Sequence, residues 1–336
     1  MNVQLGLFAD EPQPPTPPPV QPAEVSARIT RLASSLPKSL RMGTSSWSFP
    51  GWDGMVYDRR VSQATLARHG LTAYGAHPLF RTVGLDRTYY RSIGAEDYRA
   101  YADMVSDDFR FLVKADRLLT SPLSPESPSG GRANPYFLDA QYAVEHVLGP
   151  IAEGLGEKAG PVLFQFSPIP PNLVGGRDAF IDRLNTFLEA LPAGLLYAIE
   201  LRTPAFLTER YVQMLGDTGA THCYNVHPAM VSLARQLSLV SPFHQPALVM
   251  RWILHSGLEY NAAKDRYAPF DQIVDEDSMS RERIATAVID ALIAEREAFV
   301  IANNKAEGSA PHSILRLAEH ITSWSSSSPE GEANAS

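Results

Sequence analysis

Short apolar runs alternate with longer amphipathic segments along most of this chain. The apolar runs predict eight strands, at residues 42–46, 80–85, 109–114, 162–166, 196–202, 221–225, 248–252 and 299–303. The segments between and after them predict helices at 62–75, 95–105, 136–154, 177–190, 207–218, 229–238, 280–297 and 310–321. Strand followed by helix, about eight times over roughly 280 residues, is typical of an α/β fold, the (β/α)8 TIM-type barrel with parallel strands.

The two ends of the chain differ from this middle part. Residues 11–19, EPQPPTPPP, form a proline tract, which acts as an extended and semi-rigid spacer. We therefore expect residues 1–40 to be a disordered tail and residues 41–322 to be the barrel domain. Residues 323–336 are rich in serine and acidic residues, and we expect a second disordered tail there.

Several of the apolar runs end in polar or charged residues. Side chains alternate between the two faces of a strand, so Ala198, Glu200 and Arg202 share one face of the fifth strand. The other strands end in Lys114, Gln165, Asn225, Arg251 and the triplet Asn303, Asn304 and Lys305. In a TIM-type barrel the carboxyl ends of the strands meet at the end where active sites lie. For any single one of these positions a surface residue is the better interpretation, but for six of the eight together we expect a common polar pocket.

The expected pocket carries an excess of positive charge. Its acid, Glu200, stands against four cations, which are Lys114, Arg202, Arg251 and Lys305. The chain as a whole has a net charge of -8, which argues against autonomous, non-specific binding to nucleic acid. A cationic pocket on an acidic protein attracts a small anionic ligand, and a phosphate- or carboxylate-bearing molecule is the ligand class that we expect.

The residue types suggest separate roles within the pocket. Glu200, close to several cations, stays ionised, which suits a base or an electrostatic partner. Lys114 suits an acid, a charge clamp or, if desolvated, an amine nucleophile, and Arg202 completes the catalytic candidates. Ser309 starts a helix whose free N–H groups suit a phosphate, although helix capping without a ligand is the alternative. The substrate-binding candidates are Gln165, Asn225, Arg251, Asn303, Asn304, Lys305 and Ser309.

Other kinds of site find little support in the sequence. His222 and His227 flank the sixth strand, but no set of Asp, His and Glu ends successive strands, so we expect no metal site. Glycine-rich nucleotide motifs and a nucleophile elbow are absent, and no cofactor is indicated. Cys223, the single cysteine, fits a core residue better than a nucleophile. The chain has neither an apolar run of membrane-spanning length nor a signal-peptide pattern, so we expect a cytoplasmic protein that does not bind membranes.

A short apolar peptide precedes the proline tract. Its sequence, QLGLF, resembles the binding motif for the bacterial sliding clamp at Gln4, Leu5, Leu7 and Phe8, with Gly6 in place of the usual serine or aspartate. Clamp docking is one interpretation of this peptide. An apolar segment without a partner is the other.

Blocks of residues along the chain also resemble the YecE-like family, the domain of unknown function 72. The blocks are GTSSW at 43–47 followed by Trp52, Gly54 and Tyr57, then FRTV at 80–83, TYY at 88–90, FLVK at 111–114, GPVLFQF at 160–166, AIELR at 198–202 and NN at 303–304. The resemblance implies a TIM-type barrel with a polar pocket, supplies no established reaction, and adds Trp47 and Tyr89 to the substrate-binding candidates. Its second strand usually carries a glutamate where this chain has Gly84, so that role is absent here or passes to Asp86.

Three functions are compatible with these observations. The first is an enzyme acting on a phosphate- or carboxylate-bearing substrate. The second is an accessory protein of DNA maintenance that is brought to the sliding clamp by residues 4–8. The third is a binding module without catalytic activity, which the missing acid at Gly84 favours.

Overall fold

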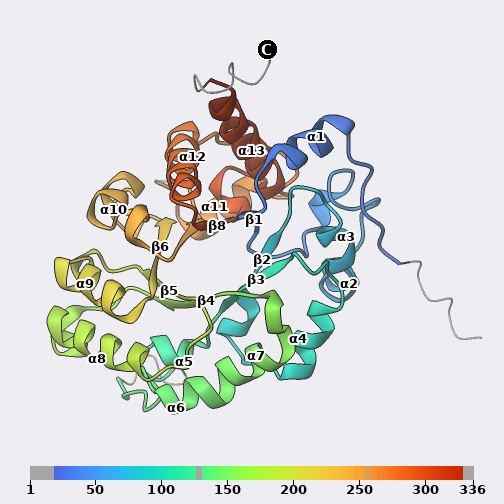
Figure 1. Ribbon diagram of the computed structural model, residues 1–336. Coiled ribbons are helices and arrows are strands. Elements are labelled where there is room, and N and C mark those ends of the chain that lie inside the picture. Colours follow the sequence, from blue (N-terminus) through green and yellow to red (C-terminus); the bar gives the residue numbers. More distant parts are fainter. Residues whose placement is uncertain (1–18, 126–130, 256, 328–336) are drawn as a thin grey trace, which may run out of the picture.

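The computed structural model describes residues 19–125, 131–255 and 257–327. In Figure 1 the strands form a central ring, and they close into a barrel in the order β1 to β8 with every pair parallel. The strands are β1 Leu40–Thr44, β2 Thr82–Leu85, β3 Arg110–Lys114, β4 Ala159–Phe166, β5 Tyr197–Leu201, β6 Thr221–Val226, β7 Ala247–Trp252 and β8 Glu297–Ala302. The predicted (β/α)8 barrel is confirmed.

The helices form a layer outside the barrel (Figure 1). They are α1 Ala27–Ser35, α2 Gln63–His69, α3 Leu71–Gly75, α4 Ala95–Ala102, α5 Arg117–Thr120, α6 Ala140–Ala143, α7 Gly149–Leu155, α8 Arg177–Glu189, α9 Glu209–Thr218, α10 Leu233–Leu239, α11 Tyr260–Tyr267, α12 Ser278–Ile293 and α13 Ala310–Ser327. The helix expected at 136–154 is interrupted by a π-helical turn, Val144–Leu148, just before Pro150. Proline lacks the N–H that a regular helix needs there, which accounts for the break.

Two apolar layers hold the barrel together. The interior is filled by side chains that point inward from the strands, namely Leu112, Leu163, Ala198, Cys223, Val249, Phe299 and Ile301. The strand residues between these positions face the helices, as Ile199 and Leu201 of β5 do. The alternation expected for the fifth strand is therefore confirmed, and it directs every second side chain toward the barrel axis.

The expected boundary at residue 40 is wrong, because residues 19–39 belong to the folded part. The segment before α1 pairs with the loop after β1, where Ala23 N–H donates to Val56 O (3.0 Å) and Asp58 N–H donates to Gln21 O (2.9 Å). Helix α1 then packs beside α13, and Ala33 and Leu36 are buried in the main core. Ala33 and Leu36 are part of a helical apolar stripe, at 29, 32, 33 and 36, which the proline-rich composition of the region obscured.

Two further segments contain helix that the sequence did not predict. Helix α13 continues to Ser327, beyond the boundary expected at 322. The connection between β7 and α12, residues 253–277, contains α11. Among the described helices, none is both long and apolar enough to span a membrane.

Candidate functional site

A ring of mostly polar positions lies at the carboxyl end of the barrel, one layer above the apolar interior. On β3 to β8 the positions follow an interior residue by two, and β1 and β2 contribute Ser45 and Gly84 at the same end; the whole set is Ser45, Gly84, Lys114, Gln165, Glu200, Asn225, Arg251 and Asn303. Because side chains two apart in a strand point the same way, the pattern that fills the interior also directs these groups toward one another. Six of the eight were predicted as site residues from the sequence.

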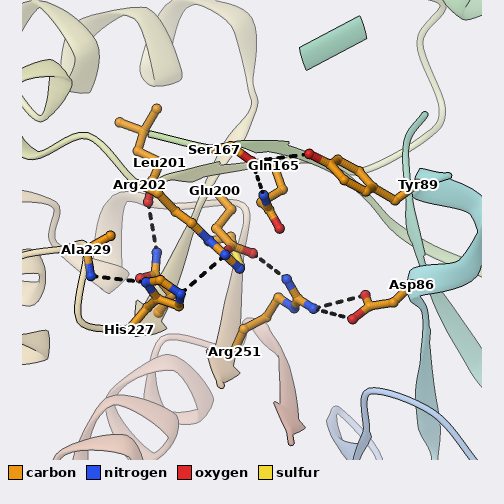
Figure 2. Close-up of polar contacts among 12 residues, drawn as sticks. Asp86, Tyr89, Gln165, Ser167, Glu200, Leu201, Arg202, His227, Ala229 and Arg251 are labelled. Carbon is orange, nitrogen blue, oxygen red and sulfur yellow. Dashed lines mark hydrogen bonds and ion pairs between the residues drawn. The ribbon is translucent and has the colours of Figure 1, made fainter. Parts of the chain in front are cut away.

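Glu200 is the centre of an ion-pair network at the carboxyl end of the barrel (Figure 2). Its Oε2 accepts a hydrogen bond from Arg251 Nη1 at 2.6 Å, and its Oε1 accepts from Arg202 Nε at 2.9 Å. Neither Glu200 nor Arg251 is appreciably exposed to solvent. Charge-assisted contacts of this length are strong, and they hold both arginines in fixed directions.

The environment of Glu200 makes it a poor base. Burial by itself would raise its pKa, but the nearby Arg251 and Arg202 lower the pKa of Glu200 to about 2. Both carboxylate oxygens already accept hydrogen bonds from arginine. Of the two roles that the sequence left open for Glu200, the geometry supports the electrostatic partner.

Asp86 provides a second acid on the far side of Arg251. Arg251 Nη2 donates to both Asp86 oxygens, at 2.9 and 2.8 Å. Asp86 lies two residues beyond Gly84, in the 3-10 turn η2 (Asp86–Tyr89) that follows β2. Asp86 therefore contacts the same network from a position two residues beyond Gly84.

Lys114 ends β3 beside this network without an acidic partner of its own. Its Nζ lies 3.6 Å from the ring centroid of Tyr89, a cation–π contact, and its residue exposure is 7%. Within the described residues, no carboxylate oxygen lies within 4.0 Å of this amine. Burial lowers the pKa of Lys114 to about 8, although Asp86 opposes the effect. A fraction of this amine is therefore neutral near physiological pH.

Lys305, in the turn that follows β8, presents a second amine of the same kind. It is 6% exposed, and its Nζ lies 4.3 Å from the ring centroid of Tyr260. Burial lowers the pKa of Lys305 to about 8, again against an opposing effect of Asp86. No ion pair joins Lys305 to an acid in the described part of the chain.

His227 lies beside Arg202 at the edge of the network. Arg202 Nη1 is 3.3 Å from His227 Nε2, and Ala229 N is 3.1 Å from His227 Nδ1. Burial and Arg202 lower the pKa of His227 to about 4, so its imidazole is neutral and carries one proton. The tautomer therefore decides which of the two ring nitrogens accepts a hydrogen bond.

A cleft opens beside this network at the end of β1, β2 and β8. Its volume is about 470 Å³, and Asp86 belongs both to its wall and to the ion-pair network. The cleft is lined by Ser45, Ser46, Trp47, Ser48, Phe49, Gln63, Ala67, Gly84, Leu85, Asp86, Arg87, Tyr90, Tyr260, Asn303 and Lys305. A volume of this size accommodates a small molecule.

Of the remaining predicted residues, Asn303 and Trp47 line the cleft, whereas Gln165 and Asn225 do not. Asn303 lines the cleft and donates from Nδ2 to Ser45 Oγ at 2.7 Å, while Trp47 lines it with its Nε1 engaged by Leu66 O at 3.0 Å. Gln165 contacts Ser167 Oγ at 3.3 Å, and this hydroxyl also contacts Tyr89 (Figure 2). Asn225 is fully buried and donates from Nδ2 to Leu201 O at 3.1 Å, below the opening.

Ser309 and Asn304 do not reach the opening. Ser309 is buried with its hydroxyl 3.1 Å from His312 Nδ1, and Asn304 Oδ1 accepts from the first N–H of α13, that of Ala310, at 2.8 Å. The segment at 272–277 covers this helix start, where Val274 N–H donates to Glu307 O at 2.7 Å. The helix start that was expected to bind phosphate is therefore capped by the protein itself.

The structure also brings in residues that the sequence did not single out as ligands. Asp86, His227 and Tyr260 all contact predicted site residues. The sequence signal for His227 was its place two residues after Asn225, whereas Tyr260 lies in a long connection without a strand-end position. Gln4, Leu5, Leu7 and Phe8 lie outside the described residues.

Neither a metal site nor a reactive thiol emerges from the described residues. No group of three His, Cys, Asp or Glu side chains among them is arranged to hold a metal ion. Cys223 is fully buried in the barrel interior, and burial raises the pKa of its thiol well above the ordinary value. That placement agrees with the core residue expected from the sequence.

Replacing Arg251 by methionine tests the network. The change leaves Glu200 buried with Arg202 alone, so we expect the free energy of unfolding at pH 7 to fall by about 3–5 kcal/mol in urea denaturation. Because the pKa of Glu200 is about 2 in the folded protein and 4.5 ordinarily, the wild-type advantage is present above pH 4.5 and declines as the pH falls toward 2.

Two further variants make this measurement specific. Adding Glu200→Gln to Arg251→Met removes the unpaired charge and should restore part of the loss. Arg210→Met removes an ion pair with Asp182 on the exposed surface, and we expect little change. Equal stability of Arg251→Met and the wild type at pH 7 would contradict the role assigned to the network.

Comparisons with known proteins agree with this architecture. The family model described as "Protein of unknown function DUF72" matches residues 41–333, and no curated protein matches the chain. A DUF72 protein of Thermotoga maritima has a similar structure, with a TM-score of 0.57 and 18% identity over 84% of this chain and 99% of its own. A DUF72 protein of Enterococcus faecalis gives a TM-score of 0.55 and 19% identity over 84% and 95% of the two chains. The closed barrel and the family match together identify the chain as a member of the DUF72 family.

Proposed function

We propose that the protein is an enzyme that binds a phosphate- or carboxylate-bearing small molecule at the carboxyl end of its barrel. The observation that carries this proposal is the pair of nearly buried amines, Lys114 and Lys305, that lack an acidic partner among the described residues. A buried charge without a partner costs free energy. An anionic group placed between them and the arginines offsets that cost.

The balance of charges around the opening supports the same ligand chemistry. The two acids, Glu200 and Asp86, contact arginine and stand against four cations, which are Arg202, Arg251, Lys114 and Lys305. The carboxyl end of the barrel therefore retains a net positive charge that favours an anion.

Within this proposal Lys114 is the group that exchanges protons with the substrate. Its pKa of about 8 lets it be protonated or neutral near physiological pH, which general acid–base catalysis requires. Glu200 acts as the charge partner that fixes the two arginines. Binding without turnover of any anionic substrate would instead favour the non-catalytic module.

Binding of ribose 5-phosphate, measured by isothermal titration calorimetry, tests the anion site. We expect Lys114→Met and Lys305→Met each to weaken binding about 10-fold or more, because each removes a charged donor. Lys38→Met, which changes an exposed lysine just before β1 at the other end of the barrel, should leave binding unchanged. The absence of saturable binding to the wild type would overturn the proposal.

The two lysines also predict how binding depends on pH. An amine is charged below its pKa, so affinity for ribose 5-phosphate should be highest below pH 8 and fall as the pH rises from 7 to 9.5. The phosphate stays dianionic over this range, since its second pKa is about 6. The same titration with the Lys114→Met/Lys305→Met double variant should show little pH dependence. A wild-type affinity that stays constant to pH 9.5 would contradict the assignment.

We also propose that residues 4–8 dock the protein on the bacterial sliding clamp. The support is the match at Gln4, Leu5, Leu7 and Phe8 together with the attachment point of this segment. Pro19 O accepts from Arg59 Nη2 at 3.2 Å, so the tail joins the fold beside the loop that follows β1, on the side of the cleft. A docked clamp would hold the carboxyl end of the barrel, the mouth of the protein, close to DNA.

A pull-down with purified clamp tests this docking. The wild-type chain should retain the clamp, and a Leu7→Ala/Phe8→Ala variant should lose it, because both large apolar side chains are removed. Leu173→Ala changes an exposed leucine of the barrel and is the matched control. Equal recovery of the clamp by all three proteins would remove the proposal and leave the anion site unaffected.

A further inference from the structure

The cleft next to the ion-pair network has an aromatic rim. Tyr90 and Tyr260 are 69% and 56% exposed, the two highest values among the exposed aromatic side chains of the described part, and both line this cleft. Phe49 and Trp47 lie deeper in its wall. Exposed rings that gather on one cleft offer flat apolar surfaces to a ligand.

Each exposed ring has a cation near one of its faces. Lys305 Nζ lies 4.3 Å from the centroid of Tyr260, and the guanidinium carbon of Arg117 lies 5.9 Å from that of Tyr90. Tyr90 also packs edge-on against Tyr89, whose ring contacts Lys114. Aromatic rings and cations are thus paired at the cleft and next to it, and a molecule with both a ring and an anionic group matches such pairs.

The wall of the cleft next to Gly84 is polar. Gly84 has no side chain, and its backbone packs closely on β1, since a Cβ there would lie 3.3 Å from Ser45 Cα and 3.6 Å from Ile301 Cγ2. Ser45 and Asn303 also line the cleft, and Asn303 Nδ2 donates to Ser45 Oγ at 2.7 Å. These polar side chains suit the hydrogen-bonding groups of a heterocycle or a sugar.

Building on the proposed function, we infer that the ligand joins its anionic group to a flat ring, as a mononucleotide does. The ring lies in the cleft against Tyr260 and Tyr90, with its polar edge toward Ser45 and Asn303. The anionic group reaches the amines of Lys114 and Lys305. This inference names the substrate class of the proposed site and gives the aromatic residues a role in specificity.

Calorimetric titration of the full chain with AMP, GMP, CMP and UMP, each compared with ribose 5-phosphate, tests the inference. At least one mononucleotide should bind about 10-fold or more tighter than ribose 5-phosphate, because stacking of a base on an aromatic ring contributes that much. Tyr260→Ala should weaken mononucleotide binding more than ribose 5-phosphate binding and so abolish the advantage, and Tyr260→Phe should preserve it.

The matched control is Tyr136→Ala, which removes a tyrosine that is 43% exposed and does not line the cleft. It should bind mononucleotides as the wild type does. The proposed binding of a flat ring in the cleft is wrong if ribose 5-phosphate binds as tightly as every mononucleotide, or if the Tyr260→Ala variant still binds a mononucleotide about 10-fold tighter than ribose 5-phosphate. Either result leaves the proposed anion site unaffected. If neither ribose 5-phosphate nor any mononucleotide binds, the anion site is wrong and the ring site falls with it.

Discussion

A single carboxylate, Glu200, determines the arrangement of the mouth of this barrel. It is removed from water, and its charge persists because Arg251 and Arg202 contact its two oxygens. The arginines are oriented in turn, so that Arg251 also reaches Asp86 and Arg202 points at His227. The role of Glu200 is therefore to orient the two arginine side chains, because it accepts a hydrogen bond from each of them.

This arrangement decides which charges remain for a ligand. Both acids of the mouth are neutralised by arginine, whose charge does not vary in the range of biological pH. The surplus positive charge rests on Lys114 and Lys305, whose amines are partly desolvated. The arginines, which are always charged, are thus held by the two acids, whereas the lysines, whose charge varies with pH, remain for a ligand. This arrangement suits the binding of an anion and the transfer of a proton.

The sequence predicted the fold and most of the ring because both depend on local alternation. Lys114 and Glu200 were predicted because they lie at the ends of apolar strand runs, and alternation along the fifth strand gave the face of Glu200. The residues that the sequence did not predict lie in turns and connections, whose course the periodicity of the strands and helices does not determine. Asp86 lies in a short turn after β2, and Tyr260 lies in the long connection between β7 and α12. The segment at 272–277 covers the start of the helix near Ser309.

The pairing of β1 with β8 has a consequence for how the protein is made. The cleft draws Ser45 from the start of the chain and Asn303 from near its end, and the two are joined by a hydrogen bond across 258 positions. Helix α1 likewise packs on α13, the last of the described helices. Residues near position 45 therefore gain their contacts only after β8 and the residues that follow it have been synthesised, so the cleft forms late in translation.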